Sequence, residues 1–365
     1  MLSGNLTCKR QGVPQFANRH NAILTNPASR EAYESQPMNH TSSPLRHLLH
    51  GTALAVSLAL GTAAFPGAAF AAAPQVKTQA PGFYRVMLGD FEVTALSDGT
   101  VDLPVDKLLD EPAAKTTAAL GKSFLHAPVE TSVNGFLINT GTKLVLIDTG
   151  AGTLFGPTLG KLVASLQAAG YKPEQVDDIF LTHMHPDHLG GLAANGALVF
   201  PNATVHADQR DADFWLSKAK LEQASAESKG SFQGATASLT PYIAAGKFQP
   251  FDGSGEIVPG VKAWSSYGHT AGHTSYVVES KGQKLIVTGD LIHVGAVQFA
   301  DPAVTIEFDT DKKTAAVARA KVFAAAAKEG ALIGAAHISF PGLGHLRAAG
   351  KSWQWIPVNY STELK

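Results

Sequence analysis

Four residues that commonly bind metals lie close together in the segment 182–188, which reads THMHPDH. The imidazoles of His183 and His185, two residues apart on an extended loop, can face one ion, and Asp187 and His188 can then turn toward a second. Imidazole nitrogen and carboxylate oxygen are ordinary ligands of zinc and related divalent metals. Hydrolases with two such ions hold them about 3.5–4 Å apart around a shared oxygen. The spacing therefore predicts a two-metal site.

Three later segments can supply the remaining ligands, because each follows an expected strand. They contain His269, Asp290 and His337. Loops at strand ends are where functional sites are usually built. Taken singly, each of these residues could equally be a surface residue or a satisfied core residue. Beside the cluster at 182–188, a role as a metal ligand becomes the favoured interpretation.

The elements that must position these residues follow an α/β pattern, in which a pair of strands followed by a helix occurs twice. Gly89-Asp90 predicts a tight turn between the first two strands. Residues 103–127, which contain Pro104 and Pro112, predict an irregular excursion near the site. The expected strands are 83–88, 91–96, 135–139, 144–147, 178–181, 262–266, 275–279, 285–288 and 332–336, and the expected helices are 154–169, 212–223, 235–245 and 312–328.

Composition excludes several other classes of protein. Hydrophobic residues make up 45% of the 365 residues and charged residues 16%, which is enough apolar material for a large core and argues against a disordered chain. The net charge is −1, so there is no basic excess to bind a nucleic acid. Cys8 is the single cysteine, which excludes an intramolecular disulfide framework and a multi-cysteine metal site.

The N-terminal residues are typical of a targeting segment. Residues 48–60 form a short apolar run that follows Arg46 and precedes Ala69-Phe70-Ala71, the pattern of a secretory signal peptide. The run is shorter than the roughly 20 residues of a membrane span, so an uncleaved anchor is the less favoured alternative. Met38 stands at a natural start. We therefore expect an N-terminal extension over 1–37 that is disordered or not translated, a signal peptide over 38–71, a hydrolase domain over 72–365, and a periplasmic or secreted enzyme that is free of the membrane after cleavage.

The H-x-H-x-D-H motif at 183–188, together with LIDTG at 146–150, resembles the metallo-β-lactamase superfamily. The resemblance implies a single-domain αββα sandwich with two metals at the edges of its sheets. It further implies that Asp290 bridges the metals, that Asp148 orients a ligand, and that His273 supports a loop. The implied ligands are His183, His185 and His269 for one metal and Asp187, His188 and His337 for the other. His206 and His345 are expected to be non-ligands.

A closer similarity points to the methyl parathion hydrolase family, which comprises exported dimeric phosphotriesterases whose nearest relatives hydrolyse aryl lactones. It rests on the segments 91–101 (FEVTALSDGTV), 154–160 (LFGPTLG), 212–217 (ADFWLS) and 356–361 (IPVNYS). The chain departs from the phosphotriesterase pattern in the shorter loop at 218–230 and at Leu108, His293, Ile306 and Phe308. These departures favour a lactonase or arylesterase acting on substrates like dihydrocoumarin. The residues expected to line the substrate pocket are Leu108, Phe155, Trp215, His293, Ile306 and Phe308.

The expected reaction follows from the metals. Two cations lower the pKa of a shared water, and the resulting hydroxide attacks the lactone carbonyl carbon. Asp187 or Asp290 can hold the proton, and His293 either contacts the opened ring, donates that proton, or simply narrows the pocket. Zinc is the first choice of metal, and manganese, cobalt and iron fit the same ligands.

Several alternatives stay open at this stage. A phosphotriesterase comes second and an acyl-homoserine lactonase third, because the metal ligands serve all three reactions. A glyoxalase-like thioesterase and a metal-storing protein without turnover are weaker alternatives. The expected partner is a small aryl lactone or ester, no nucleic acid is expected to bind, and a homodimer is implied by the similarity alone.

Overall fold

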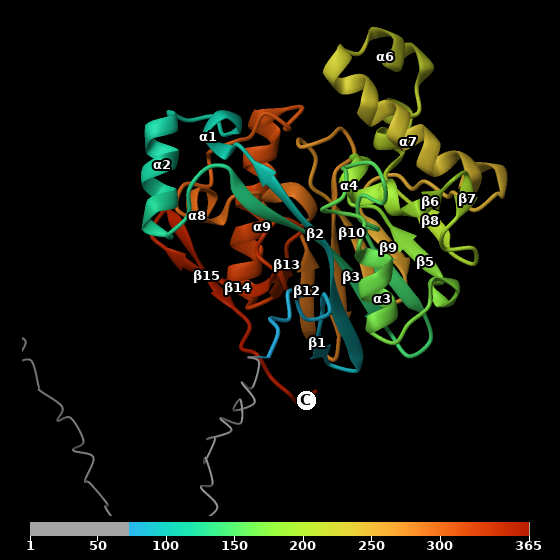
Figure 1. Cartoon of the computed structure of the whole chain (residues 1–365), viewed down its shortest axis with the longest axis horizontal. Coiled ribbons are helices and arrows are strands. Elements are labelled where there is room, and N and C mark those ends of the chain that lie inside the picture. The colour runs from blue at the N-terminus through green and yellow to red at the C-terminus, as the bar shows by residue number, and fades with distance from the viewer. Residues whose placement is uncertain (1–72, 365) are drawn as a thin grey trace, which may run out of the picture. The chain divides into compact units, whose positions relative to one another are not determined.

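Two β-sheets pack face to face in the part of the chain that the structure, a computed structural model, describes, which is residues 73–364 (Figure 1). The first sheet has the strand order β1-β2-β3-β4-β5-β8 and the second the order β15-β14-β13-β12-β11-β10-β9. The first contains β1 (Phe83–Leu88), β2 (Phe91–Leu103), β3 (Val129–Asn139), β4 (Leu144–Ile147), β5 (Asp178–Phe180) and β8 (Thr204–His206). The second contains β9 (Gly255–Val258), β10 (Val261–Ser265), β11 (Thr274–Ser280), β12 (Gln283–Val287), β13 (Leu332–Gly334), β14 (Leu343–Ala349) and β15 (Ser352–Pro357). A separate short pair is β6 (Ala193–Ala194) with β7 (Ala197–Leu198).

Helices cover the outer faces of both sheets. The helices are α1 (Val105–Leu108), α2 (Ala113–Lys122), α3 (Leu162–Ala168), α4 (Pro186–Leu189), α5 (Gln209–Trp215), α6 (Lys218–Gln223), α7 (Ala226–Ala244), α8 (Gly295–Gln298) and α9 (Lys312–Glu329), with short 3₁₀ turns η1 (Pro173–Gln175), η2 (Gly190–Leu192) and η3 (Gly289–Leu291). Phe136 of the first sheet and Tyr276 of the second belong to one buried cluster between the sheets. Residues of α3 and α7 pack on the first sheet, and Phe323 of α9 packs on the second. This layering confirms the expected αββα sandwich.

The ends of four strands bring Asp148 and six of the seven candidate ligands to one edge of the sandwich, where His269, which follows β10, joins them. Strands β4 and β5 are parallel, and so are β12 and β13, so each pair delivers its following loops to the same side. Asp148 follows β4, the segment 182–188 follows β5, Asp290 follows β12, and His337 follows β13. The site is therefore assembled by topology, from loops that are distant in sequence.

Most of the expected elements are present, and local chemistry explains them. The hairpin between β1 and β2 turns at Gly89, whose φ is 57°, and a Cβ there would lie 2.5 Å from the carbonyl oxygen of Ser280. Helix α9 begins after Asp311, whose side chain accepts a hydrogen bond from the backbone N–H of Thr314, and it ends at Gly330 with φ 65°. Both boundaries lie within one residue of the predicted ones.

The largest error concerns the predicted helix at 154–169, of which only α3 is helical. The carboxylate of Asp98 accepts hydrogen bonds from the backbone N–H groups of Ala151, Gly160 and Leu162, and so holds residues 150–161 as a loop. Gly156-Pro157 within that loop is a turn signal that the helical spacing concealed. The loop matters because Phe155 lies on it.

Other boundaries also differ from the expectations. The excursion at 103–127 contains α1 and α2, each of which starts directly after a proline, a favoured position near a helix start. The predicted helix at 212–223 is interrupted at Ser217, whose hydroxyl caps α6. Helix α7 starts nine residues before the predicted 235. The strand at 332–336 is not the last one, because β14 and β15 follow it as a hairpin.

The predicted extension over 1–37 and signal peptide over 38–71 lie outside the described residues, and they stay predictions. Residues 75–365 form one compact unit. Among residues 73–364, no helix combines the length and the apolar character that crossing a membrane requires.

Candidate metal centre

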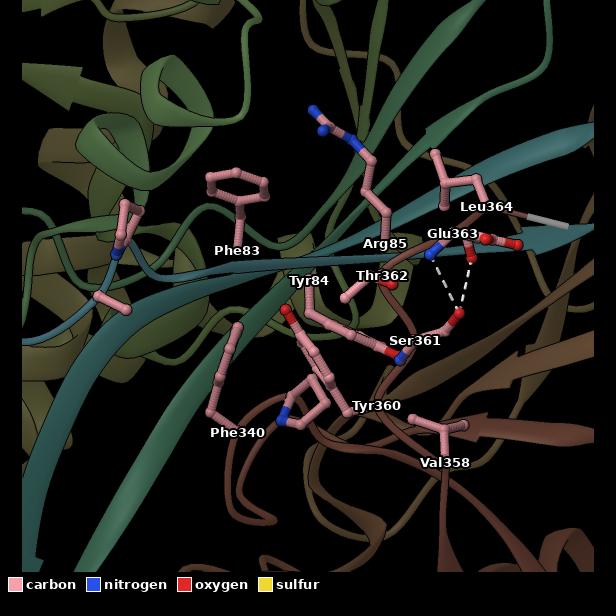
Figure 2. A pocket seen from close by; sticks show the side chains of 13 residues that line it. Phe83, Tyr84, Arg85, Phe340, Val358, Tyr360, Ser361, Thr362, Glu363 and Leu364 are labelled. Atoms are coloured by element: carbon pink, nitrogen blue, oxygen red, sulfur yellow. Dashed lines mark hydrogen bonds between the residues drawn. The ribbon is translucent and has the colours of Figure 1, made fainter. Parts of the chain in front are cut away.

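A cavity of about 660 Å³ lies where the C-terminal residues pass beside β1 (Figure 2). Its described lining is mostly apolar and aromatic and contains no histidine. Tyr84 donates a hydrogen bond to the carbonyl oxygen of Asn359, and Arg85 pairs with Glu92 at 3.2 Å. The Tyr84 contact joins the C-terminal residues to β1 and the Arg85 contact joins β1 to β2, and the two do not form a group that can do hydrolytic chemistry.

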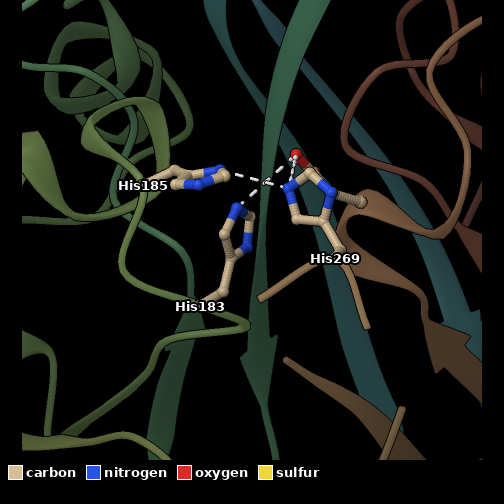
Figure 3. A group of neighbouring side chains, drawn as sticks. His183, His185 and His269 are labelled. Carbon is tan, nitrogen blue, oxygen red and sulfur yellow. Dashed lines mark hydrogen bonds and ion pairs between the residues drawn. The ribbon is translucent and has the colours of Figure 1, made fainter. Parts of the chain in front are cut away.

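The histidines instead converge at the edge of the sandwich. Figure 3 shows His183, His185 and His269 with their ring nitrogens facing a common point. Asp290 completes this first group. His269 Nε2 lies 3.1 Å from His185 Nδ1 and 3.3 Å from Asp290 Oδ2. His183 Nε2 lies 3.5 Å from the same oxygen. Three imidazole nitrogens and one carboxylate around one point are a suitable ligand set for a divalent cation.

A second group lies directly beside the first and consists of Asp187, His188 and His337. Asp187 Oδ2 lies 3.5 Å from His188 Nε2 and 3.6 Å from His337 Nε2. Asp290 Oδ1 lies 3.1 Å from each of these two nitrogens. Asp290 therefore directs one oxygen toward each group. We call the seven residues of both groups the metal floor: His183, His185, Asp187, His188, His269, Asp290 and His337.

Contacts behind the floor fix the orientation of its rings. His188 Nδ1 donates to Asp148 at 2.8 Å, and His337 Nδ1 donates to the carbonyl oxygen of Ser132 at 3.0 Å. His269 Nδ1 donates to Asp309 at 2.9 Å. Because each Nδ1 is a donor to its partner, the Nε2 atom of the same ring presents its lone pair to the centre.

The backbone around Asp290 leaves no room for a side chain on the preceding residue. Gly289 has φ 53°, and a Cβ there would lie 2.7 Å from His273 Nε2. That nitrogen accepts a hydrogen bond from the backbone N–H of Asp290 at 3.0 Å, while His273 Nδ1 lies 3.0 Å from the carbonyl oxygen of Ser266. Both ring nitrogens of His273 are thus engaged with the backbone, so His273 supports the turn and does not face the centre.

Electrostatics indicates that the floor is built for cations. Three floor atoms, His183 Nε2, His188 Nε2 and Asp290 Oδ1, are buried without a hydrogen-bond donor or acceptor that satisfies them. Burial and the neighbouring His269 lower the pKa of His185 to about 3. Burial also acts to lower the pKa of His269, but the carboxylates of Asp290 and Asp309 raise it to about 9. Unsatisfied ring nitrogens and carboxylate oxygens are thus crowded together, and the pKa values of His185 and His269 are shifted in opposite directions. Both features fit the metal ligands that the sequence predicts.

His293 lies close to the floor, and the two predicted non-ligands, His206 and His345, lie away from it. His293 Nε2 is 3.1 Å from Asp290 Oδ2, and its ring stacks on His337 with centroids 4.9 Å apart. His206 bonds to Asp178 at 3.1 Å, and His345 lies near the carbonyl oxygen of Ala331.

A cavity of about 430 Å³ opens above the metal floor. Four of the six predicted pocket residues line it, namely Phe155, Trp215, His293 and Phe308. Leu108 and Ile306 do not, which corrects the prediction for both. Ile306 is fully buried and Leu108 packs near it, in a separate apolar cluster. Pro186, which lies between floor residues, also lines the cavity, and we call the other apolar lining residues the cavity wall: Val101, Leu103, Phe155, Leu159, Trp215 and Phe308.

Two buried aspartates that support the site were not predicted. The carboxylate of Asp211 accepts hydrogen bonds from the backbone of Met184 and Gly272 and from the hydroxyl of Thr270, and so joins two ligand-bearing loops. Burial raises the pKa of Asp211 to about 6. Asp309 contacts His269 as described above. The available signal was weak, because Asp211 directly precedes a predicted helix and Asp309 directly follows Phe308, and neither stands in a motif.

Comparison with known proteins assigns the family. The family model described as "Metallo-beta-lactamase superfamily" matches residues 128–337, a range that holds every residue of the metal floor. The chain belongs to this superfamily. It is a metal-dependent hydrolase of the metallo-beta-lactamase superfamily, with lactonases among its relatives.

The relatives with known names include an N-acyl homoserine lactonase from Bacillus cereus, 25% identical over 235 residues that cover 59% of this chain and 83% of that one. Among solved structures, the hydrolase AbOPH of the beta lactamase superfamily is 39% identical with a TM-score of 0.75, over 78% of this chain and all of that one. AidC, a dizinc quorum-quenching lactonase solved with the product N-hexanoyl-L-homoserine, is 28% identical with a TM-score of 0.71, over 77% and 99% of the two chains.

Proposed function

We propose that this superfamily member hydrolyses aryl lactones and aryl esters of the dihydrocoumarin type. The observation that carries the proposal is the cavity wall, where the aromatic side chains of Phe155, Trp215 and Phe308 stand above the metal floor. Aromatic walls suit a flat aryl substrate through stacking and apolar contact. Outside the floor, the described lining carries one charged side chain, Glu307, which pairs with Lys312 at 2.6 Å.

Two divalent cations bound by the metal floor would supply a Lewis acid for the carbonyl oxygen and a water of lowered pKa. His183, His185 and His269 would hold one and Asp187, His188 and His337 the other, with Asp290 between them. We propose zinc, as in the dizinc relative, while manganese, cobalt and iron suit the same donors.

The side chains of this site supply binding and proton transfer. The cavity wall holds the aryl ring and excludes water from the floor. Asp187 is the floor carboxylate that is most open to the cavity, with 18% of its side chain exposed, and its Oδ2 is positioned to take a proton from the attacking water. His293 Nε2 donates its N–H to Asp290 Oδ2 at 3.1 Å, which holds the imidazole at the edge of the cavity as a proton donor of this site. The phenolate that leaves is stable in itself and requires no strong acid.

A second candidate function is the hydrolysis of N-acyl homoserine lactones. It is favoured by the B. cereus relative and by AidC. Its substrate carries an aliphatic chain, so the cavity wall would contact that chain in place of an aryl ring. Phosphotriester hydrolysis, suggested by the similarity to the methyl parathion hydrolase family, would use the same floor.

The test is a three-substrate assay on the full zinc-loaded chain. It measures kcat/KM for dihydrocoumarin, N-hexanoyl-L-homoserine lactone and a dimethyl aryl phosphotriester. We expect dihydrocoumarin to be preferred by at least about tenfold, the effect of one good aromatic contact. Preference for the homoserine lactone would establish the second candidate, and preference for the phosphotriester would assign the chain to that activity. Binding of two metals without turnover of any substrate would overturn the proposal.

A further inference from the structure

Asp309 is a buried carboxylate that touches both the metal floor and the loop 299–311, which carries Phe308 of the cavity wall and which we call the wall loop. It lies in the loop 299–311, directly after Phe308, and its side chain is fully buried. Its Oδ1 accepts the hydrogen bond from His269 Nδ1 at 2.9 Å. Its Oδ2 accepts one from the backbone N–H of Ile306 at 3.2 Å. One carboxylate therefore orients a floor imidazole and closes the turn 306–309 that presents Phe308.

The backbone beside Asp309 strengthens the same connection. The N–H of Thr310 donates to the carbonyl oxygen of His269 at 2.9 Å, and that of Asp311 donates to Gly268 at 2.8 Å. Phe308 lines the cavity, and its ring centroid lies 5.9 Å from that of His293. The wall loop and the loop that carries His269 are thus joined by three consecutive residues.

Arg319 of α9 holds this arrangement from behind. It is the largest of the fully buried side chains in the described chain, and its guanidinium lies 3.9 Å from Asp309 Oδ2. It donates to the carbonyl oxygens of Pro302 at 2.7 Å and Val304 at 2.8 Å, both in the wall loop. It also donates to the carbonyl oxygen of Leu291, the residue after Asp290. A planar guanidinium can satisfy these partners together, which a lysine cannot.

We propose that Asp309, held by Arg319, is a positioning residue that couples the cavity wall to the metal floor, so that one change alters both metal affinity and substrate selectivity. The selectivity part rests on the proposed function, while the metal part does not. Asp148 provides a contrast, because it orients His188 in the same way but bonds to Thr182 and not to the loop 299–311.

The test compares Asp309→Asn with Asp148→Asn as the matched control. In Asp309→Asn the new amide keeps a single acceptor oxygen, so its N–H₂ group faces the N–H of either Ile306 or His269. Zinc affinity is measured by competition with a chelating dye, and hydrogen exchange is measured over 299–311. We expect both variants to weaken zinc affinity about 10–100-fold. Faster exchange in 299–311 is expected in Asp309→Asn alone.

Selectivity is then compared at saturating zinc, as the ratio of kcat/KM for dihydrocoumarin and N-hexanoyl-L-homoserine lactone. We expect Asp309→Asn to shift the ratio at least threefold and Asp148→Asn to leave it within twofold. The coupling would be overturned if Asp309→Asn left the zinc affinity unchanged. It would also be overturned if this variant left both the hydrogen exchange of 299–311 and the ratio of the two kcat/KM values unchanged.

A third variant covers two further outcomes. If Asp309→Asn fails to fold, Arg319→Lys, which keeps a cation but loses most of the contacts, is expected to show the same pair of effects in weaker form. Parental zinc affinity and exchange in that variant would overturn the coupling as well. If the parent hydrolyses no lactone, the proposed function fails, and zinc affinity and exchange still decide the coupling.

Discussion

The metal floor and the cavity wall are neighbours, yet they are built in different ways. Floor residues follow strand ends of both sheets and are almost entirely buried, and several rings have their second nitrogen bound from behind. Wall residues come from the end of β2, from the loop at 150–161, from α5 and from the loop 299–311. Phe155 and Phe308 remain 45% and 38% exposed.

Because of this difference, we expect the floor to determine the class of reaction and the wall to determine which substrate is chosen. A floor in which three of the rings are fixed from behind tolerates little change, because a shifted imidazole leaves a buried polar atom unsatisfied. A half-exposed wall side chain can change at a small cost in stability. We therefore expect floor substitutions to abolish the chemistry, and wall substitutions to redirect it.

The strongest test of this separation is Asp290→Ala. Asp290 is the carboxylate that faces both ligand groups, so its removal leaves neither group complete. We expect loss of at least one equivalent of bound zinc and a decrease in kcat/KM of at least about 10³-fold, equal to about 4 kcal/mol. Elemental analysis and steady-state kinetics measure the two effects.

The control for that variant is Asp301→Asn, which removes a partly exposed carboxylate paired with Lys115 on the surface. It should keep parental zinc content and activity. If Asp290→Ala retained both zinc ions and most of the activity, the floor would not be the reaction centre.

The floor could be predicted from the sequence, because its spacing is local. The motif at 183–188 places four metal-binding residues within six positions, and His269, Asp290 and His337 each follow a strand that apolar patterning reveals. The parallel pairing of β4 with β5 and of β12 with β13 then brings the residues after these strands to one edge of the sandwich.

The wall could be predicted only in part, because it depends on loops whose course is set by distant contacts. Phe155 was expected at the pocket, but on a helix, since nothing local reveals that Asp98 ties down the 150–161 loop. Ile306 was expected at the pocket and is buried beneath it, two residues from Phe308, which does line it. The turn closed by Asp309 decides between these two side chains, and no pattern in the sequence reports it.

A wall substitution of intermediate effect is Phe308→Ala. Removing this ring deletes one aromatic surface of the cavity and leaves the floor contacts intact. We expect kcat/KM for dihydrocoumarin to fall about tenfold, in line with about 1.4 kcal/mol for an aromatic contact. Zinc content should stay parental.

The matched control is Val317→Ala on α9, a large apolar side chain that is 62% exposed and does not line the cavity. This variant should change neither kcat/KM for dihydrocoumarin nor the zinc content. Loss of zinc in Phe308→Ala, or an equal loss of activity toward N-hexanoyl-L-homoserine lactone, would remove the distinction between wall and floor.

The smallest effect is expected from a carboxylate that belongs to neither region. Asp178 starts β5, and its two oxygens contact His206 at 3.1 Å and Lys143 at 3.0 Å. Burial raises the pKa of this carboxyl, but the hydrogen bonds from His206 and Lys143 outweigh burial and lower it below the usual 3.8. A lowered folded-state pKa means that the ionised carboxylate stabilises the fold above about pH 3.8, and that this contribution is lost as the pH falls through the folded-state value.

We therefore expect Asp178→Asn to reduce the free energy of unfolding by about 1 kcal/mol at pH 6, the net value of one such hydrogen bond. The difference from the parent should shrink as the pH falls below about 3.8, because the unfolded parental carboxyl takes up a proton there and the folded one does so only at a lower pH. Urea unfolding at pH values from 6 down through this range measures the difference in unfolding free energy. Both kcat/KM and zinc content at pH 8 should stay parental, since β5 keeps its place between β4 and β8. A difference in unfolding free energy that does not change with pH would mean that Asp178 acts by packing alone. A large loss of activity would mean that the floor depends on the far end of β5, so that its rigidity reaches beyond the contacts that orient its rings.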